Sequence, residues 1–300
     1  MLSIVVPCYN VEKYVDECLR SILNQTYSLL EVIVVVDGAT DGTEDIVRLH
    51  ARADRRVRVI RQSNRGLSGA RNTGWRKARG EFLWFIDSDD RISRDAATLM
   101  VQSLQRSGSD FAVANYRRFN RRTHWRAGPW IQSAHRERRI SIAPGDFPEI
   151  LVNAVAWSKV YRRNFWDSMG TEFPEGKLYE DQPVSAKAYA MARAVDILPE
   201  VLIDWRDRTD ATSITQQTAS VIDLQARMDA AQASLNVLVK SGGPSLAEER
   251  RIQLLSNDIQ HSARHIPYAS AEFWDALHDG VVMRLFTVEG VESAGASVAV

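Results

Sequence analysis

The sequence has 300 residues, which is enough chain to bury a sizeable core in one large domain or two modest ones. Its composition, with 45% hydrophobic and 25% charged residues, is that of a soluble globular protein. The formal net charge is zero, so the overall charge indicates neither nucleic acid nor an anionic membrane as a partner.

The two cysteines, Cys8 and Cys18, are too few for a disulfide framework, and no second cysteine pair completes a zinc site. We expect both thiols to be reduced and buried. No window reaches the roughly 18 apolar residues that a membrane span requires. The sequence therefore predicts a cytoplasmic protein, either free or peripheral at the inner face of the cell membrane.

The first 115 residues alternate between apolar strands and amphipathic helices. Asn10 fits as the N-cap of the first helix, and Gly80 is expected to close the helix that follows a Gly- and Arg-rich loop. Because continuous apolar strands alternate with helices, we expect an α/β fold with a mostly parallel sheet covered on both faces. Ligands of such sheets bind beyond the carboxyl ends of the strands, where PCYN, DGATDGT and DSDD stand. Strands are predicted at 2–7, 31–36, 57–62, 82–87 and 110–116, and helices at 11–25, 43–53, within 64–80 and at 94–106.

The rest of the chain is less regular. Residues 117–143 are Arg-rich and fit a hairpin insertion that shapes an acceptor site, in which the stretch 124–130 (HWRAGPW) stacks on a sugar or simply packs as a hairpin. From about 219 to 286 the pattern predicts helices. Between these parts we expect a partly helical segment at 149–168, a loop at 171–182, a helix at 183–193 and a strand at 197–208.

Three carboxylates, those of Asp87, Asp89 and Asp90, directly follow the apolar run FLWFI. Like charges this close repel, so each must stay solvated or find a partner. An Asp-x-Asp pair at a strand end can bind Mg²⁺ or Mn²⁺, which typically joins carboxylates to substrate phosphates. The same residues also fit a solvated turn in which Asp90 or Ser93 caps the next helix.

Two further segments near strand ends contain residues suited to a nucleotide. Asp37 ends the strand EVIVVV, where a carboxylate can accept from a base N–H or a ribose hydroxyl, although DGATDGT also fits a turn with helix capping. In NRGLSGARN, Gly66 and Gly69 allow close approach of the backbone to a ligand. Arg65 or Arg71 of the same segment can pair with a phosphate.

The second half of the chain contains a candidate general base and a candidate anion-binding pair. Glu180 and Asp181 lie in LYEDQ, and a helix N-terminus with Asp181 as N-cap explains them as well as catalysis does. Arg206 and Arg208 precede a polar stretch and can close over a diphosphate or lie on a solvated loop.

The order and spacing of these segments are more specific than any one of them. Over residues 1–115, the succession IVVPCYN, ILNQTY, EVIVVVDGATDGT and GEFLWFIDSDD closely resembles the family 2 glycosyltransferases, which have a GT-A fold. Residues 150–215 resemble the bacterial subgroup that glycosylates cell-wall polymers such as teichoic acids. They also resemble glycosyltransferase modules fused to CDP-glycerol glycerophosphotransferases. One departure is that Val36 and Ala39 replace an acid and a serine of the usual VDDGSTDGT, while the second acid is retained as Asp37.

The resemblance implies a GT-A domain, a Rossmann-like, mostly parallel sheet flanked by helices, followed by a C-terminal helical extension. It also implies that Asp181 is the catalytic base, with Glu180 beside it, and that Asp87 and Asp89 form the Asp-x-Asp motif, with Asp89 as direct ligand of Mn²⁺ or Mg²⁺. The implied domain occupies 1–215, with a nucleotide-binding half at 1–115 and an acceptor half at 116–215, before an extension at 216–290 and a disordered tail or linker at 291–300. The implied donor-binding residues are Pro7, Tyr9, Asp37, Arg71, Asp87, Ser88, Arg206 and Ser213.

The implied activity is an inverting, metal-dependent transfer of a hexosyl or N-acetylhexosaminyl group from a nucleotide-diphosphate sugar to a hydroxyl of a cell-wall or surface glycopolymer. A UDP-sugar is the expected donor, a polyol-phosphate or glycan the expected acceptor, and the C-terminal helices offer a surface for a homo-oligomer. One alternative is a nucleotidyl- or glycerophosphotransferase, which would need a Lys-rich loop near the N-terminus, where Lys13 is the only early lysine. Another is a catalytically weak or inactive module that serves as a binding scaffold in a larger polymer-synthesis enzyme.

Overall fold

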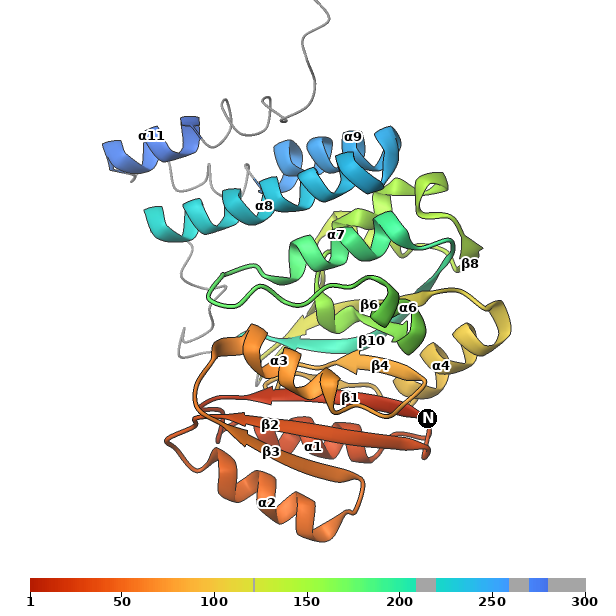
Figure 1. Cartoon of the computed structure of the whole chain (residues 1–300), viewed down its shortest axis with the longest axis vertical. Helices are drawn as coiled ribbons and strands as arrows, with labels where there is room; N and C mark the ends of the chain where they lie inside the picture. Colours follow the sequence, from red (N-terminus) through yellow and green to blue (C-terminus); the bar gives the residue numbers. More distant parts are fainter. Residues whose placement is uncertain (121, 209–219, 259–269, 280–300) are drawn as a thin grey trace, which may run out of the picture.

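The computed structural model describes residues 1–120, 122–208, 220–258 and 270–279. Within these residues ten strands form one sheet, and helices cover both of its faces (Figure 1). The path through the sheet runs β3-β2-β1-β4-β9-β6-β10-β5, with β7 paired to β6 and β8 paired to β10. The strands are β1 Leu2–Cys8, β2 Leu30–Asp37, β3 Val57–Gln62, β4 Phe82–Phe85, β5 Arg91–Ile92, β6 Phe111–Phe119, β7 His124–Arg126, β8 Arg139–Ile142, β9 Lys159–Arg162 and β10 Val195–Arg206.

Helices alternate with strands up to β10, and only helices follow β10 in the described residues. The α-helices are α1 Val15–Leu23, α2 Thr43–Ala53, α3 Gly66–Arg76, α4 Ala96–Ser107, α5 Pro129–Ala134, α6 Arg163–Ser168, α7 Asp181–Met191, α8 Val221–Ser241, α9 Gly243–Gln253 and α11 Ala271–Asp279. Short helical turns are η1 Pro144–Asp146, η2 Pro148–Val152, η3 Ala156–Ser158 and the π-helical η5 Leu254–Asp258.

Strand β1 shows how the sequence produces the layers. Successive side chains of a strand point to opposite faces of the sheet. Ile4 and Val6 accordingly lie in a core with α1, α2 and α4, whereas Val5 lies in a second core with α3, α6 and α7. A strand that is buried on both faces must be apolar throughout, which confirms the predicted α/β sheet with helices on both sides.

The direction of the strands places several chain segments at one edge. Strands β1 to β4 are parallel, β6 and β10 are parallel, and β9 runs antiparallel to its neighbours β4 and β6. Because β9 reverses the direction twice, β6 and β10 point the same way as β4. The carboxyl ends of β1, β2, β4 and β10, with the residues that follow each, therefore lie along the same edge of the sheet.

Helix α3 approaches this sheet unusually closely at Gly74. A Cβ atom at this position would lie 2.3 Å from Cγ1 of Val5 and 3.3 Å from Cγ2 of Val35. Glycine thus lets α3 pack directly onto β1 and β2. This close packing fixes the position of the α3 side chains that point toward the strand ends.

Two local predictions about helix ends were wrong. Helix α1 begins at Val15, and Asn10 has a φ of 49° with its side-chain oxygen accepting the backbone N–H of Thr40 at 2.8 Å, so it joins two loops and caps no helix. Helix α3 ends at Arg76, and Gly80 lies beyond it in the connection to β4. A local apolar pattern therefore located these helices without locating their ends.

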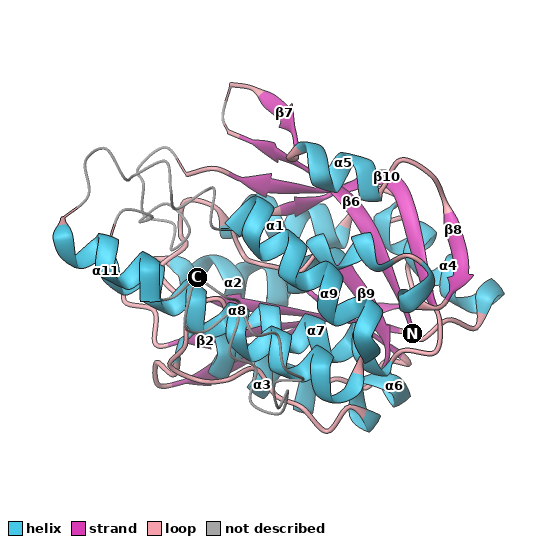
Figure 2. Ribbon diagram, turned by 90° about the horizontal axis from the view of Figure 1, so that it is seen from above, coloured by secondary structure: helices cyan, strands magenta, loops and turns pink. Residues whose placement is uncertain are grey.

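The second half of the chain adds elements that the sequence pattern did not separate. Strand β9 occupies Lys159–Arg162, inside the segment expected to be partly helical. The Arg-rich segment does contain the expected hairpin, since β7 pairs antiparallel with β6, and α5 follows it (Figure 2). Part of that segment thus extends the sheet itself.

The C-terminal helices pack onto the rest of the fold. Leu235 of α8 and Leu246 of α9 share a core with Val184 of α7, and Phe273 of α11 packs with Leu224 of α8. None of the helices that the structure describes is both long and apolar enough to cross a membrane. The predicted tail at 291–300 lies outside the described residues.

Candidate active site

Three acids stand at the carboxyl end of β4, as the sequence predicted. The chain turns there, with the backbone N–H of Asp90 donating to the carbonyl of Asp87 at 3.0 Å. Ser88 and Asp90 are buried in this turn. Burial raises the pKa values of Asp89 and Asp90, and the neighbouring acids raise them further. The turn therefore holds three carboxyl groups so close together that their negative charge is unfavourable unless a positive group offsets it.

A single arginine of α3 binds the first of these acids. Arg71 is only 1% exposed, and its Nη2 donates to Oδ1 of Asp87 at 2.6 Å, while its Nη1 donates to Oε1 of Glu180 at 2.5 Å. Burial alone would lower the pKa of Arg71, but Asp87 and Glu180 outweigh it and raise that pKa. Arg71 thus joins two predicted site segments that lie 109 residues apart in sequence.

The other acids of the turn are held by the end of β10. The backbone N–H of Arg206 donates to Oδ1 of Asp90 at 2.7 Å, and its Nε donates to the carbonyl of Asp89 at 2.6 Å. Arg208 reaches the carboxylate itself, with Nε 2.7 Å from Oδ2 of Asp89. Arg206 also forms an ion pair with Glu17 and is only 7% exposed, so it is an anchored strand residue and not part of a surface loop.

The loop before α7 reaches the site because α3 holds it. Asn72 exchanges hydrogen bonds with the backbone of Phe173, and Ser68 donates to the carbonyl of Pro174 at 2.8 Å. Arg65 pairs with Glu175 at 2.6 Å. These contacts fasten the predicted loop at 171–182 along the helix that carries Arg71.

The two adjacent acids that end this loop have different partners. Helix α7 begins at Asp181, so Asp181 is its first residue and not the N-cap that was one of the two interpretations. Glu180 forms an ion pair with Arg71, whereas among the described residues Asp181 accepts one hydrogen bond, from the backbone N–H of Ala156 to Oδ2 at 3.3 Å. Burial raises the pKa of Glu180 to about 7 and also raises that of Asp181, with Arg71 opposing both shifts.

A buried lysine near Asp181 was not predicted. Lys159 of β9 is fully buried, and its Nζ donates to the carbonyls of Asn153 and Val155 at 2.6 and 2.7 Å. Burial lowers its pKa to about 7, while Asp181 acts in the opposite direction. Nothing in the local sequence SKVYR indicated this role, because a lysine in a short apolar run normally marks a surface position.

The remaining predicted donor residues lie at the ends of β1 and β2. Pro7 is buried within β1, and Tyr9 just beyond it is 49% exposed. Asp37 ends β2 and is 2% exposed, with Oδ1 accepting Nε2 of Gln62 at 2.6 Å and the backbone N–H of Arg65 at 2.9 Å. Ser213 lies outside the described residues.

The acids at the end of β4 suit a divalent cation whose other ligands come from a substrate. Within the described part of the chain, no group of three or more His, Cys, Asp or Glu side chains could hold a metal ion by itself. Asp87 and Asp89 each give one oxygen to an arginine and retain a second, and Oδ2 of Asp90 is buried without a hydrogen-bond partner. Mg²⁺ and Mn²⁺ are commonly bound by one or two carboxylates together with substrate phosphates, so the residues fit such an ion.

Comparison with known proteins identifies relatives over most of the chain. The family model described as "Glycosyl transferase family 2" matches residues 3–165. The glycosyltransferase GlyA of Streptococcus pneumoniae is 31% identical over 250 residues, which cover 81% of this chain and 35% of GlyA. The uncharacterized glycosyltransferase EpsJ of Bacillus subtilis is 32% identical over 247 residues, which cover 79% of this chain and 70% of EpsJ.

Solved structures show the same fold. TarS 1–349 of S. aureus in complex with UDP-GlcNAc superimposes with a TM-score of 0.76 at 23% identity, over 95% of this chain and 82% of that one. The mannosyltransferase PcManGT of Pyrobaculum calidifontis, in complex with GDP-Man and Mn²⁺, gives a TM-score of 0.54 at 19% identity, over 95% and 87%. At these identities the likeness shows the arrangement of sheet and helices.

Proposed function

Because the chain belongs to the family 2 glycosyltransferases, we propose that it transfers a sugar from a nucleotide-diphosphate sugar to a hydroxyl group, with inversion at the anomeric carbon. The observation that carries this proposal is the unequal pairing of the two acids at the start of α7. Arg71 pairs with Glu180, while Asp181 makes a single long hydrogen bond, to the backbone, within the described part of the chain. One carboxylate is thereby left to act as a base, and a single displacement needs one base and no protein nucleophile.

In this mechanism Asp181 accepts the proton of the acceptor hydroxyl. The acceptor oxygen forms a bond to the anomeric carbon from the face opposite the leaving group, and the bond from that carbon to the diphosphate oxygen breaks with its electron pair on the diphosphate. A base works best when its pKa lies near the working pH. Burial and Asp87 raise the pKa of Asp181, while Arg71 lowers it. Because burial raises the pKa of Glu180 as well, the choice between the two acids rests on their different hydrogen-bond partners.

The donor is proposed to lie along the carboxyl edge of the sheet. Tyr9 would border the nucleoside and Asp37 would recognise the base, while Asp87 and Asp89 would hold Mn²⁺ or Mg²⁺. A bound cation would supply positive charge that stabilises the departing diphosphate. The nucleotide-sugar complexes of TarS and PcManGT, the latter with Mn²⁺, support this assignment, and a UDP-sugar is the donor that we expect.

The acceptor is proposed to be a hydroxyl of a cell-wall or surface glycopolymer, and the transferred group a hexosyl or N-acetylhexosaminyl residue. The chain spans only 35% of GlyA, and its role within any longer enzyme is part of the same proposal. We also propose that the glycosyltransferase domain ends near residue 215 and that the later helices form its extension, which offers a surface for self-association.

The proposal is tested first with Asp181→Asn, which removes the base at nearly constant shape. We expect transfer to fall roughly 10²- to 10⁴-fold because general base catalysis contributes on that order. Nucleotide binding, followed by calorimetry, should be retained. Glu175→Gln is the matched control, since this acid of the same loop forms an exposed pair with Arg65. A variant with wild-type transfer rates would remove Asp181 from the mechanism.

The cation site is tested with Asp89→Ala. We expect the variant to lose the enhancement of nucleotide binding by Mn²⁺, measured by calorimetry with and without the ion. Donor hydrolysis by the wild-type chain across a panel of nucleotide sugars identifies the donor in the same assay series. A wild-type chain that binds nucleotide but neither transfers nor hydrolyses any sugar would instead indicate an inactive binding module.

A further inference from the structure

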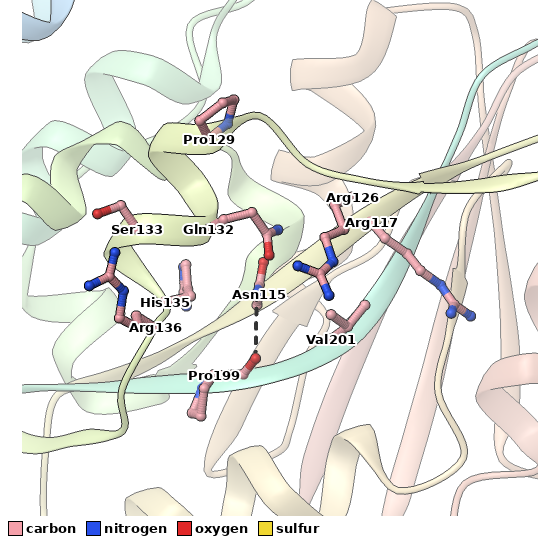
Figure 3. A pocket seen from close by; sticks show the side chains of 10 residues that line it. All are labelled: Asn115, Arg117, Arg126, Pro129, Gln132, Ser133, His135, Arg136, Pro199 and Val201. Atoms are coloured by element: carbon pink, nitrogen blue, oxygen red, sulfur yellow. Dashed lines mark hydrogen bonds between the residues drawn. The ribbon is translucent and has the colours of Figure 1, made fainter.

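A cleft opens between α5, the β7 hairpin and strands β6 and β10 (Figure 3). Its volume of about 660 Å³ is within the ~300–1,000 Å³ usual for small-molecule sites and exceeds the space needed by one small ion. It is lined by Asn115, Arg117, Arg126, Pro129, Gln132, Ser133, His135, Arg136, Pro199 and Val201.

An irregularity in β10 makes the floor of this cleft. The pairing of β10 with β6 shifts register on both sides of Val201, and Asn115 of β6 donates across the gap to the carbonyl of Pro199 at 3.4 Å. Proline has no N–H to continue the ladder, so the strand bends here. Such bulges recur next to functional sites because they redirect side chains.

The charge of the cleft is positive and comes from arginine alone. Three of its ten lining residues are arginines and none is acidic. Arg117 is paired with Asp204 at 2.6 Å, whereas Arg126 and Arg136 form no ion pair with any described residue. Figure 3 shows Arg136 and Ser133 on one side of Asn115, with Arg117 and Arg126 on the other. The cleft therefore contains two guanidinium groups that are not neutralised by any acid in the described segments.

His135 does not add to this charge. Its Nδ1 lies 2.9 Å from the carbonyl of Leu198, and its Nε2 lies 2.9 Å from Nδ2 of Asn153. A ring that donates to the carbonyl through Nδ1 accepts the amide N–H of Asn153 through Nε2, which requires the neutral form. Burial also lowers the pKa of His135 to about 4.

Polar contacts connect the cleft with Asp181 on one side and with Arg206, which holds the acids after β4, on the other. Asn153 accepts from Ser158 at 2.7 Å and from Lys159 through its carbonyl, close to Asp181. On the other side Asp204, the partner of Arg117, also binds Arg91, which in turn pairs with Glu17, the partner of Arg206. The cleft is thus built on the same framework that holds the catalytic acids.

We propose that this cleft binds the acceptor chain, and that it selects a polyol or sugar chain carrying oxyanion groups. Guanidinium forks bind phosphate and carboxylate in a bidentate way. Asn115, Gln132 and Ser133 supply amide and hydroxyl groups for chain hydroxyls, and the Nε2 atom of Gln132 is buried without a hydrogen-bond partner. The inference rests on the proposed function, since it names the class of acceptor for that reaction.

The test compares the full wild-type chain with the double variant Arg126→Gln/Arg136→Gln, which removes two charges and keeps side chains of similar length. The probes are oligo(glycerol phosphate), oligogalacturonate and neutral dextran oligomers of equal length, with binding followed by calorimetry. We expect the wild type to prefer one or both anionic oligomers over dextran, and this preference to weaken as salt increases. The double variant should bind that oligomer at least about tenfold more weakly, on the scale of one charged hydrogen bond.

The matched control is Arg52→Gln/Arg55→Gln, which removes the same charge from two exposed positions, one in the last turn of α2 and one just beyond the helix. It should bind the anionic oligomers as the wild type does. The inference is overturned if both double variants lose the same affinity for the anionic oligomers, or if dextran binds the wild type as well as those oligomers do. It is also overturned if oligothymidylate binds as well as oligo(glycerol phosphate) or oligogalacturonate. Donor hydrolysis with Mn²⁺ separates the two proposals. If the wild type hydrolyses a donor but does not bind the anionic oligomers, only the acceptor cleft is refuted. If the wild type turns over no donor, the proposed function itself is refuted.

Discussion

The buried arginine of α3 gives the sharpest prediction about stability. Arg71→Met would leave Asp87 and Glu180 without the guanidinium that now lies 2.6 and 2.5 Å from them. Breaking a buried ion pair on one side typically costs about 3–5 kcal/mol, because the remaining charge stays desolvated. Methionine fills much of the same volume beside Phe173, so loss of charge rather than a cavity should dominate.

Thermal and urea unfolding measure this cost. A loss of about 3–5 kcal/mol should lower the Tm by roughly 6–20 °C in a chain of this size. Arg76→Met is the matched control on the same helix, because its pair with Glu172 is exposed and should contribute no more than about 1 kcal/mol. The double variant Arg71→Met/Glu180→Gln should recover part of the loss, since it no longer buries the second charge.

Equal costs for the Arg71 and Arg76 variants would refute this reasoning. Such a result would mean that water reaches the Asp87–Glu180 pair in solution, and the neutralisation of Glu180 by Arg71 could no longer distinguish it from Asp181. If Arg71→Met/Glu180→Gln is no more stable than Arg71→Met, the charge of Glu180 is likewise not desolvated in the folded chain.

Three further predictions concern the framework of the site. Because the pKa of Lys159 is lowered to about 7 from its ordinary 10.5, the unfolded chain binds more protons between these values, and the folded state gains stability as pH rises from about 7 to 10.5. Lys159→Met should lower the slope of the unfolding free energy against pH by up to about 1.4 kcal/mol per pH unit. If urea titrations give the wild type and the variant the same slope, Lys159 is not buried in its neutral form. Gly74→Ala should cost about 1–3 kcal/mol by overpacking against Val5, and an unchanged Tm would mean that α3 can shift freely. Tyr179→Phe removes the hydrogen bond to Asp223 at 2.6 Å and should cost about 1–3 kcal/mol, whereas a neutral result would mean that α8 does not hold the loop.

The sequence sufficed for the parallel strands β1 to β4 and for the place of the acids at the end of β4, for a clear physical reason. Strands β1 and β2 are buried on both faces, so their apolar runs had to be continuous, and parallel strands bring their carboxyl ends to one edge. The start of α1 was missed because Val11 is buried by the core without being helical. The spacing of apolar residues indicates which residues are buried. It indicates a helix only where the backbone is also helical.

The pairing of the acids could not be predicted in the same way. Arg71 and Glu180 meet only because the loop before α7 is fastened along α3, which no spacing within either segment indicates. Strand β9 was hidden for a related reason, since it is a short strand, Lys159–Arg162, whose first residue is a lysine buried by bonds to backbone carbonyls. These features depend on tertiary contacts between distant segments.

The C-terminal helices also take part in positioning the acids. Tyr179, directly before Glu180, has a φ of 57°, a left-handed conformation that costs a non-glycine residue roughly 1–2 kcal/mol. Its hydroxyl donates to Asp223 of α8, and Arg227 lies 4.7 Å from the centre of its ring, so contacts with the extension compensate the strain. A second link joins Arg250 of α9 to Gln182 at 3.0 Å. Because both links flank Glu180 and Asp181, the extension helps to set the geometry of the proposed base.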